Sequence, residues 1–397
     1  MVSTGDRTSL INCAIDHKGL PLNKVIATRR LVYLETTRGI ASIIVVFHHF
    51  MLGFFPLLKA SITHGGLRRT PLYPLINGTG AVAFFFVLSG FVLTRKYYQR
   101  FSTADLIASV IKRLPRLWLP AGLSMLVGAA VLIYVPEQHI AAARLTHSGW
   151  LADFGSAGFP QHPFLPSFSD AARNSLSVFL ESGHSYYNSN LWTMVWEFRG
   201  SLLVFAVVAI SNLIFPGKQY GVITLHVILC ILCVMLNGFQ FYLPFLIGSL
   251  IAFIHSRQSE MFRLPRWLLT VLVIITVLGF SVDRWNFVTL ASTSAIILLL
   301  GVPSLEQRLS GPIGLFLGRL SFPLYLVHVL VILSVTCFAY TSLVGMGLPG
   351  RTVLLLCLIL TWAVSLLAAW PFMALEKIWV PALNRWSQSL VRRFLVP

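Results

Sequence analysis

The stretch from residue 32 to residue 57 reads VYLETTRGIASIIVVFHHFMLGFFPL, and it decides the fold class. From Gly39 to Leu57 it contains no Asp, Glu, Lys or Arg. A helix needs about 20 mostly apolar residues to cross a bilayer, so this segment predicts a membrane span. Glu35 and Arg38 stand just before it, where the helix would meet the headgroups.

The rest of the chain has the same character. Of its 397 residues, 56% are hydrophobic and only 11% are charged, and the mean hydropathy is +0.78. Soluble proteins carry about 25% charged residues, so a water-soluble fold is excluded. The composition therefore predicts an all-α fold, a polytopic bundle of transmembrane helices.

The net charge of +17 points to membrane lipid as a partner rather than to nucleic acid. Basic residues gather in the cytosolic loops of membrane proteins, where they meet anionic headgroups. The sequence offers no Lys/Arg-rich soluble domain that would bind nucleic acid. Four of the five cysteines lie in apolar runs, which favours small buried residues over a disulfide framework.

Ten segments are long and apolar enough to be candidate spans. They are Gly39–Leu57, Pro74–Leu93, Leu117–Val135, Leu191–Phe215, Tyr220–Leu236, Phe239–Ile254, Trp267–Val282, Trp285–Val302, Leu320–Tyr340 and Val353–Leu375. We therefore expect one membrane domain over residues 31–376. A polar, basic N-terminus precedes it at residues 1–30, and a basic tail follows at residues 377–397.

The distribution of Lys and Arg predicts that both termini are cytosolic. With the N-terminus inside, the segment between spans two and three alone places six basic residues in the cytosol: Arg95, Lys96, Arg100, Lys112, Arg113 and Arg116. The longest outer segment, residues 136–190, instead holds four acids against two arginines. This bias is typical of an integral, multi-pass protein of an endomembrane or the plasma membrane. The sequon Asn77-Gly78-Thr79 falls on the predicted outer side.

Arg38 and His49 share one face of the first span. They are eleven residues apart, which is three helical turns plus about 20°, and the rise separates them by about 16 Å. His48 points about 80° away from that face. Ionisable residues at membrane depth indicate function, so His49 is a candidate general base. The alternative is a boundary charge at Arg38 and an interhelical hydrogen bond at His49.

Of the other ionisable residues within predicted spans, which are Glu197, Arg199, His226 and His328, two are candidates for the site. His328 follows Arg319 by nine residues and should match His49 in depth, which suits proton transfer between imidazoles; the alternative is an interhelical hydrogen bond. Glu197 lies in the outer half of the fourth span. A buried carboxylate needs a counter-charge, so we expect Glu197 to meet a histidine or an arginine of another helix.

Small residues in the second span favour close packing over chemistry. Ser89 and Gly90 allow neighbouring helices to approach closely. Ser89 is also a conceivable nucleophile, but no G-x-S-x-G elbow surrounds it, so packing is the favoured interpretation. No metal-ligand cluster is visible in the sequence, and no permanently bound cofactor is expected.

Five fragments, taken in order, resemble the acyltransferase-three family of integral membrane O-acyltransferases, and its fungal-type branch most closely. The first is Arg38 followed after ten residues by His49. The others are Phe85–Phe91 (FFVLSGF), Lys112–Arg116 (KRLPR), Leu191–Ser201 (LWTMVWEFRGS) and Leu320–His328 (LSFPLYLVH). Glu35 and Glu376 stand where aspartate is common in the family, and His48 stands where an apolar residue is usual.

The resemblance implies transfer of an acyl group, often acetyl, from a CoA thioester to a hydroxyl. In the family pattern the essential residues correspond to Arg38 and His49, and a further arginine and a glutamate correspond to Arg95 or Arg116 and to Glu197. Without an appended esterase-like domain, the expected acceptor is a hydroxylated small molecule, such as a secondary metabolite. Acyl-CoA would enter from the cytosol and meet basic residues. Those that we expect to bind it are Arg38, Arg95, Arg113 and Arg116, and Arg38 is alternatively a catalytic residue that stabilises the developing oxyanion.

A different class of function also fits an intramembrane line of polar groups. A transporter or flippase of an acyl group or lipid would use the same residues as a pathway. Many transporters have paired broken helices in two halves, and the sequence shows no such symmetry.

Overall fold

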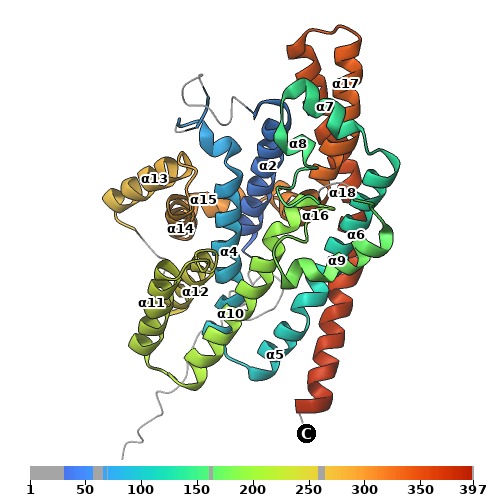
Figure 1. Cartoon of the computed structure of the whole chain (residues 1–397). Coiled ribbons are helices and arrows are strands. Elements are labelled where there is room, and N and C mark those ends of the chain that lie inside the picture. The colour runs from blue at the N-terminus through green and yellow to red at the C-terminus, as the bar shows by residue number, and fades with distance from the viewer. Residues whose placement is uncertain (1–30, 57–65, 69, 161–163, 258–263, 396–397) are drawn as a thin grey trace, which may run out of the picture.

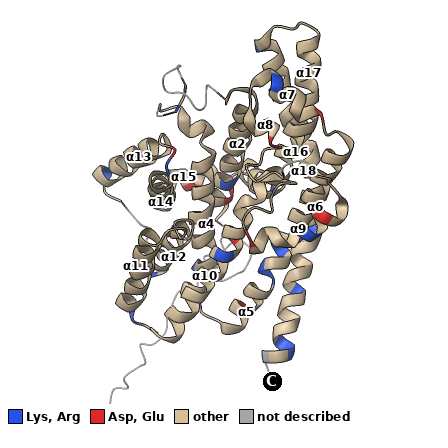
Figure 2. Ribbon diagram, viewed as in Figure 1, with Lys and Arg blue, Asp and Glu red and all other residues tan. Residues whose placement is uncertain are grey.

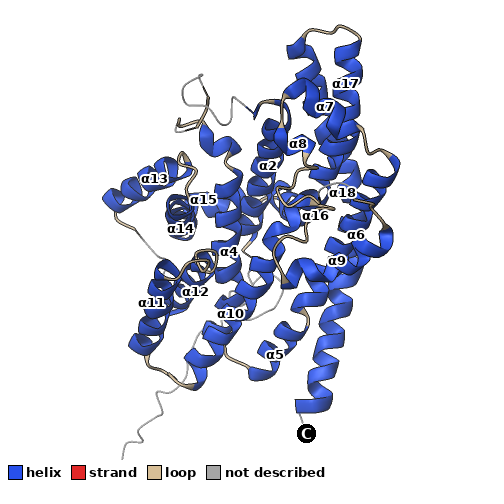
Figure 3. Ribbon diagram, viewed as in Figure 1, coloured by secondary structure: helices blue, strands red, loops and turns tan. Residues whose placement is uncertain are grey.

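The computed structural model describes residues 31–395, except for residues 57–65, 69, 161–163 and 258–263. The predicted N-terminus, residues 1–30, lies outside the described residues. In the part that is described the chain is helical, with no strand (Figure 3). The elements are α2 (Val32–Phe54), η1 (Tyr73–Ile76), α4 (Gly78–Gln99), α5 (Thr103–Ile111), α6 (Arg113–Tyr134), α7 (Gln138–Thr146), α8 (Gly149–Ala152), α9 (Phe168–Leu180), η2 (Ser189–Thr193), α10 (Met194–Leu213), α11 (Gln219–Met235), α12 (Leu243–Arg257), α13 (Arg266–Phe280), α14 (Trp285–Gly301), α15 (Pro303–Leu309), α16 (Pro312–Val331), η3 (Ile332–Thr336), α17 (Cys337–Gly345) and α18 (Gly350–Leu395).

The all-α membrane fold is confirmed, and a helix occupies each of the ten predicted segments. Within the described residues, six helices are long and apolar enough to cross a membrane, or seven if the bent pair α14–α15 is one span. Three shorter apolar helices are α11, α12 and α13. The count of ten spans and the cytosolic side of the termini stay predictions. Charged residues are sparse along the ribbon of the bundle (Figure 2).

Several helices extend beyond the apolar segments that predicted them. Helix α2 begins at Val32 rather than at Gly39, so Arg38 lies on the helix. Helix α6 begins at Arg113 rather than at Leu117. Helix α18 continues through the predicted tail to Leu395, along one side of the molecule (Figure 1). Charged residues end a hydropathy segment, but they do not interrupt backbone hydrogen bonding, so the helices run on.

Two pairs of helices approach backbone to backbone through glycine. A Cβ at Gly90 of α4 would stand 2.1 Å from the carbonyl oxygen of Phe245, and one at Gly248 of α12 would stand 2.0 Å from that of Val87. A Cβ at Gly39 of α2 would clash with the backbone of Leu317. Small residues at such crossings replace side-chain bulk with close van der Waals contact, as in other membrane bundles.

The N-terminus of α4 is fixed by two polar side chains. The Asn77 Oδ1 accepts from the Gly80 N–H at 2.8 Å, and its Nδ2 donates to the carbonyl of Phe280 at 2.7 Å. The His48 Nδ1 lies 2.9 Å from the Gly78 nitrogen and 2.9 Å from the carbonyl oxygen of Ile76. Asn77 is 1% exposed, so in the folded protein the side chain of its sequon is buried in a helix cap.

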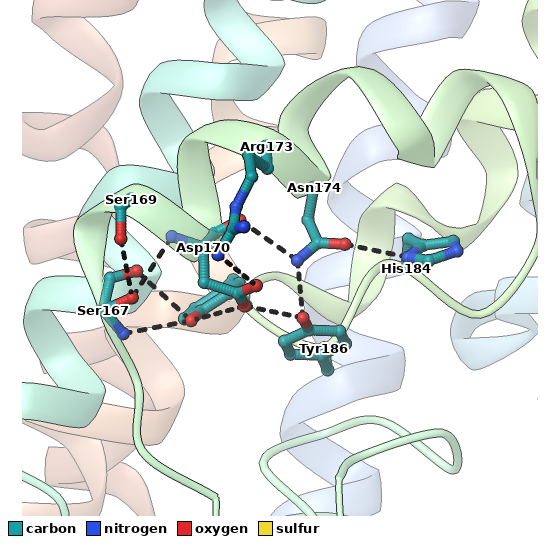
Figure 4. Close-up of polar contacts among 8 residues, drawn as sticks. Ser167, Ser169, Asp170, Arg173, Asn174, His184 and Tyr186 are labelled. Atoms are coloured by element: carbon teal, nitrogen blue, oxygen red, sulfur yellow. Dashed lines mark hydrogen bonds and ion pairs between the residues drawn. The ribbon is translucent and has the colours of Figure 1, made fainter.

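In its described residues, the predicted outer segment at residues 136–190 contains α7, α8 and α9. Asp170 near the N-terminus of α9 accepts hydrogen bonds from the hydroxyls of Tyr186 and Tyr187, at 2.7 and 3.0 Å (Figure 4). Burial raises the pKa of Tyr187 to about 12, so the tyrosine stays a neutral donor. Asn174 and His184 extend this network, which ties the segment before η2 to α9.

That tied segment supports α16. The Asn188 Nδ2 donates to the carbonyl of Leu326 at 2.8 Å, and the Asn190 Nδ2 donates to the carbonyl of Tyr325 at 2.7 Å. Both amides are buried, where a hydrogen bond is strong and its loss is costly. The outer segment therefore fixes α16 at the turn that carries His328.

Candidate active site

Two histidines from different helices meet in the bundle. The His49 Nδ1 on α2 lies 3.0 Å from the His328 Nε2 on α16. The sequence predicted that the two residues lie at a similar depth, and in the structure their side chains are in direct contact. His328 is fully buried, while His49 is half-buried. The pair is the kind of arrangement that can hold and move a proton.

Two further contacts orient the pair. The His328 Nδ1 lies 2.9 Å from the carbonyl oxygen of Leu324, one turn earlier on α16. The indole of Trp150, on α8, stacks on the His49 ring with 5.3 Å between centroids and 22° between planes. Ser148, at the N-terminus of α8, donates to the carbonyl of Leu52 at 2.7 Å, which anchors α8 on α2.

His48 is adjacent in sequence but has a different setting. Its Nδ1 faces the first turn of α4, and a Cβ at Gly78 would stand 2.5 Å from its ring. His48 therefore packs on α4 and caps it, whereas His49 faces α16. Helical geometry had predicted this divergence of the two side chains.

A cavity of about 160 Å³ lies beside Tyr325, one turn from His328 on α16. It is bounded by α2, α4, α6, η2, α10, α16 and α18. The residues that line it are Arg38, Val82, Phe85, Phe86, Leu88, Ser89, Val92, Leu93, Arg113, Arg116, Leu117, Thr193, Met194, Glu197, Ser321, Phe322, Tyr325 and Glu376. Three arginines and two glutamates thus face a largely apolar enclosure.

Glu197 is the hub of the charged groups. The Arg113 guanidinium forms an ion pair with its carboxylate, and the two side chains are 8% and 14% exposed. The Ser89 hydroxyl donates to the same carboxylate oxygen at 2.8 Å. Glu197 therefore has the arginine partner that its burial required.

The other charges lie around this hub. Arg38 pairs with Glu35 at 3.1 Å, one turn back on α2. Arg116 interacts electrostatically with Arg113, Arg38 and Glu376. The lining residues carry one more positive than negative charge, so the cavity suits an anionic ligand.

The structure divides the predicted site residues into two groups. Arg38, Arg113, Arg116 and Glu197 line the cavity, while His49 and His328 form the pair beyond it. Arg95 is not among the cavity residues. It lies half-buried on α4 in electrostatic contact with Tyr33. Of the two arginines that the family pattern left open, only Arg116 reaches the cavity.

Sequence reasoning missed three of the residues at these two places. Ser89 was assigned to packing, yet its hydroxyl faces the cavity and binds Glu197. Glu376 was noted only as a departure from a pattern, although an acid at the end of an apolar run was a usable signal. Trp150 lies on a short helix in the outer segment, where no periodicity marks it.

Tyr325 stands where the two groups adjoin. It lines the cavity, and its ring centroid is 6.4 Å from that of His328. Its hydroxyl donates to the carbonyl of Asn190 and lies 2.7 Å from the Thr193 hydroxyl. Among the described residues, no three His, Cys, Asp or Glu side chains are grouped as a metal site would require.

The comparison with known families agrees with this arrangement. A family model described as an acyltransferase domain, the one numbered three among the models with that name, matches residues 31–370. This range is most of the chain. The chain therefore belongs to the acyltransferase-three family, and it is a membrane acyltransferase. No curated protein and no solved structure matches it. Its assignment to the fungal-type branch stays a prediction.

Proposed function

We propose that the chain transfers an acetyl group from acetyl-CoA to a hydroxyl of a small molecule, such as a secondary metabolite. The observation that carries the proposal is the histidine pair next to an arginine-lined cavity in a chain of an acyltransferase family. The cavity takes the donor, and the pair takes the acceptor hydroxyl.

The cavity has the chemistry that an acyl-CoA requires. Guanidinium groups bind phosphate oxygens through paired, charge-assisted hydrogen bonds, and Arg38 and Arg116 face the cavity. The apolar lining from α4 suits the uncharged arm that ends in the thioester. Arg113 is paired with Glu197 and is 8% exposed, so it holds the cavity wall. Arg38, whose partner Glu35 lies one turn back on its own helix, and Arg116 are the two arginines that we assign to the donor.

The distance between Arg38 and His49 supports a binding role for Arg38. Eleven residues of helix separate them by about 16 Å, which an arginine side chain cannot span. Arg38 therefore does not stabilise an oxyanion at His49, and its contribution is to hold the anionic end of the donor. The arm of the donor covers the remaining distance past Tyr325.

His49 acts as the general base. It takes the proton of the acceptor hydroxyl as the hydroxyl oxygen attacks the thioester carbonyl, a contribution of about 10²–10⁴-fold to the rate. The new ester C–O bond forms, the C–S bond breaks, and the proton passes to the sulfur of the departing CoA. The pair lies under α8, with Trp150 on His49, which favours a small acceptor over a surface polymer.

The test is transfer by the purified protein in liposomes. Labelled acetyl-CoA is supplied with candidate acceptors or with a metabolite extract, and mass spectrometry follows the gain of one acetyl group. Transfer that depends on His49 supports the proposal. Movement of label across the bilayer without a new ester would support a transporter instead, and no ester with any donor would overturn the proposal.

A further inference from the structure

The hydrogen bonds of His328 determine which of its nitrogens carries a proton. Its Nδ1 lies 2.9 Å from the carbonyl oxygen of Leu324, and a carbonyl oxygen can only accept. The proton of that bond therefore belongs to Nδ1. In the neutral imidazole the other nitrogen, Nε2, then carries a lone pair.

The same reasoning passes to His49. The His328 Nε2 accepts, so the proton in the 3.0 Å contact between the rings belongs to the His49 Nδ1. In neutral His49 the lone pair is then on Nε2. We propose that His328 is a positioning residue that fixes His49 in the Nδ1–H tautomer, so that the His49 Nε2 is the base.

This inference rests on the proposed function, and it revises the role expected for His328. A second base would need a lone pair directed at the acceptor, but the lone pair of the His328 Nε2 is engaged by His49. In many enzymes a carboxylate accepts a hydrogen bond from a histidine and so fixes its tautomer. Here the backbone carbonyl of Leu324 accepts that hydrogen bond from the His328 Nδ1. A carbonyl is neutral, which suits a site at membrane depth.

The surroundings of the pair keep this geometry in place. The Asn188 and Asn190 amides bind the carbonyls of Leu326 and Tyr325, on the turn that carries Leu324 and His328. These two hydrogen bonds hold the turn of α16 that carries His328. Trp150 stacks on the other partner and limits rotation of the His49 ring.

Two isosteric substitutions separate positioning from proton transfer. In His328→Gln the amide oxygen can stand where Nε2 stood and accept from the His49 Nδ1–H, but it cannot serve as a base. In His328→Asn the amide is too short to reach that place. His328→Ala removes the group altogether.

The assay is acetyl transfer in liposomes, with kcat and KM for acetyl-CoA measured at matched abundance and thermal midpoint. We expect His328→Gln to keep kcat within about 10-fold of the wild type, as for orienting partners elsewhere. His328→Asn and His328→Ala should lose about 10²–10⁴-fold in kcat, the range of a general base in the wrong form. KM should stay within about 2-fold in all three, because the cavity is untouched.

Equal loss of kcat in the Gln and Asn variants would show that His328 itself moves the proton and would overturn the proposal. Wild-type kcat in all three variants would overturn it too. If the Asn and Ala variants fail to fold, the Gln variant decides alone, since a folded His328→Gln protein with kcat down by 100-fold or more contradicts positioning. A wild-type protein that transfers no acyl group would defeat the proposed function instead.

Discussion

The cavity and the histidine pair are neighbours with opposite construction. Six transmembrane helices contribute to the cavity, and its character comes from charge, with Arg113 and Glu197 as its centre. The pair comes from two helices, and the described contacts that orient it are to uncharged groups: a neighbouring imidazole, a backbone carbonyl and an indole. Tyr325 lies between the two.

Because of this difference, we expect the cavity to determine the affinity for the donor and the histidine pair to determine the turnover rate. Charged groups hold an anionic donor at a distance and need only be complementary to it. A base must carry a lone pair before it acts, and the described groups that contact the histidine pair carry no charge. Changes at the two places should therefore alter different kinetic constants.

The largest effect is expected at His49. We predict that His49→Ala lowers kcat by about 10²–10⁴-fold and leaves KM for acetyl-CoA nearly unchanged, because the base is lost and the donor site is intact. Steady-state kinetics at matched abundance give both constants. A rise in KM with unchanged kcat would show that His49 binds the donor. The cavity and the histidine pair would then not have separate roles.

The next effect concerns folding rather than kinetics. Glu197→Ala leaves the buried Arg113 guanidinium without its carboxylate, and breaking a buried pair in this way costs about 3–5 kcal/mol. The thermal midpoint in detergent and the yield from membranes should both fall.

Ser89→Ala is the matched control for Glu197→Ala, because it removes only a hydroxyl from the same carboxylate. It should cost about 1 kcal/mol, as for a typical hydrogen bond. Equal thermal midpoints for the two variants would mean that the ion pair does not organise the cavity.

A smaller effect is expected for Arg38→Lys. The ammonium keeps the charge but not the planar fork, so KM for acetyl-CoA should rise about 10-fold or more while kcat changes little. Competition by free CoA gives an independent measure of donor affinity. A lower kcat at saturating donor would show that Arg38 acts on the reacting atoms. That result would contradict the binding role inferred from its separation from His49 of about 16 Å along α2.

The smallest effect is expected for His48→Ala. It removes the Nδ1 group that contacts Ile76 and Gly78 at the start of α4, a loss of about 1 kcal/mol in stability. Turnover per folded molecule should stay within about 2-fold of the wild type, since the His49 contact to α16 remains. Active-site titration corrects for abundance, and a loss as deep as that of His49→Ala would refute the assignment of the two histidines to different faces.

Much of this arrangement could be predicted from the sequence where one helix carried the signal. Arg38 and His49 lie on one helix, so their spacing alone predicted a common face and the divergence of His48. The cost of a buried carboxylate predicted an arginine or histidine partner for Glu197. Depth along two helices predicted that His49 and His328 would be at one level.

The rest depended on partners that no single segment reveals. Ser89 suggested packing because Gly90 beside it does pack on Phe245, and only the placement of α10 shows that the serine faces Glu197. Trp150 reaches His49 because α8 folds back onto α2, which is a tertiary event without a periodic signature. Helix ends were also missed, since a charge such as Arg113 stops an apolar run without stopping a helix.

The 46-residue length of α18 has a consequence for imaging. At about 1.5 Å per residue the helix is about 69 Å long. Even with a tilt of 40°, at the upper limit for membrane helices, it would extend about 53 Å along the bilayer normal, and a bilayer with its headgroups is about 40–45 Å thick. Part of this rod must therefore project from a detergent micelle, and it would provide an asymmetric landmark for aligning single particles in electron microscopy.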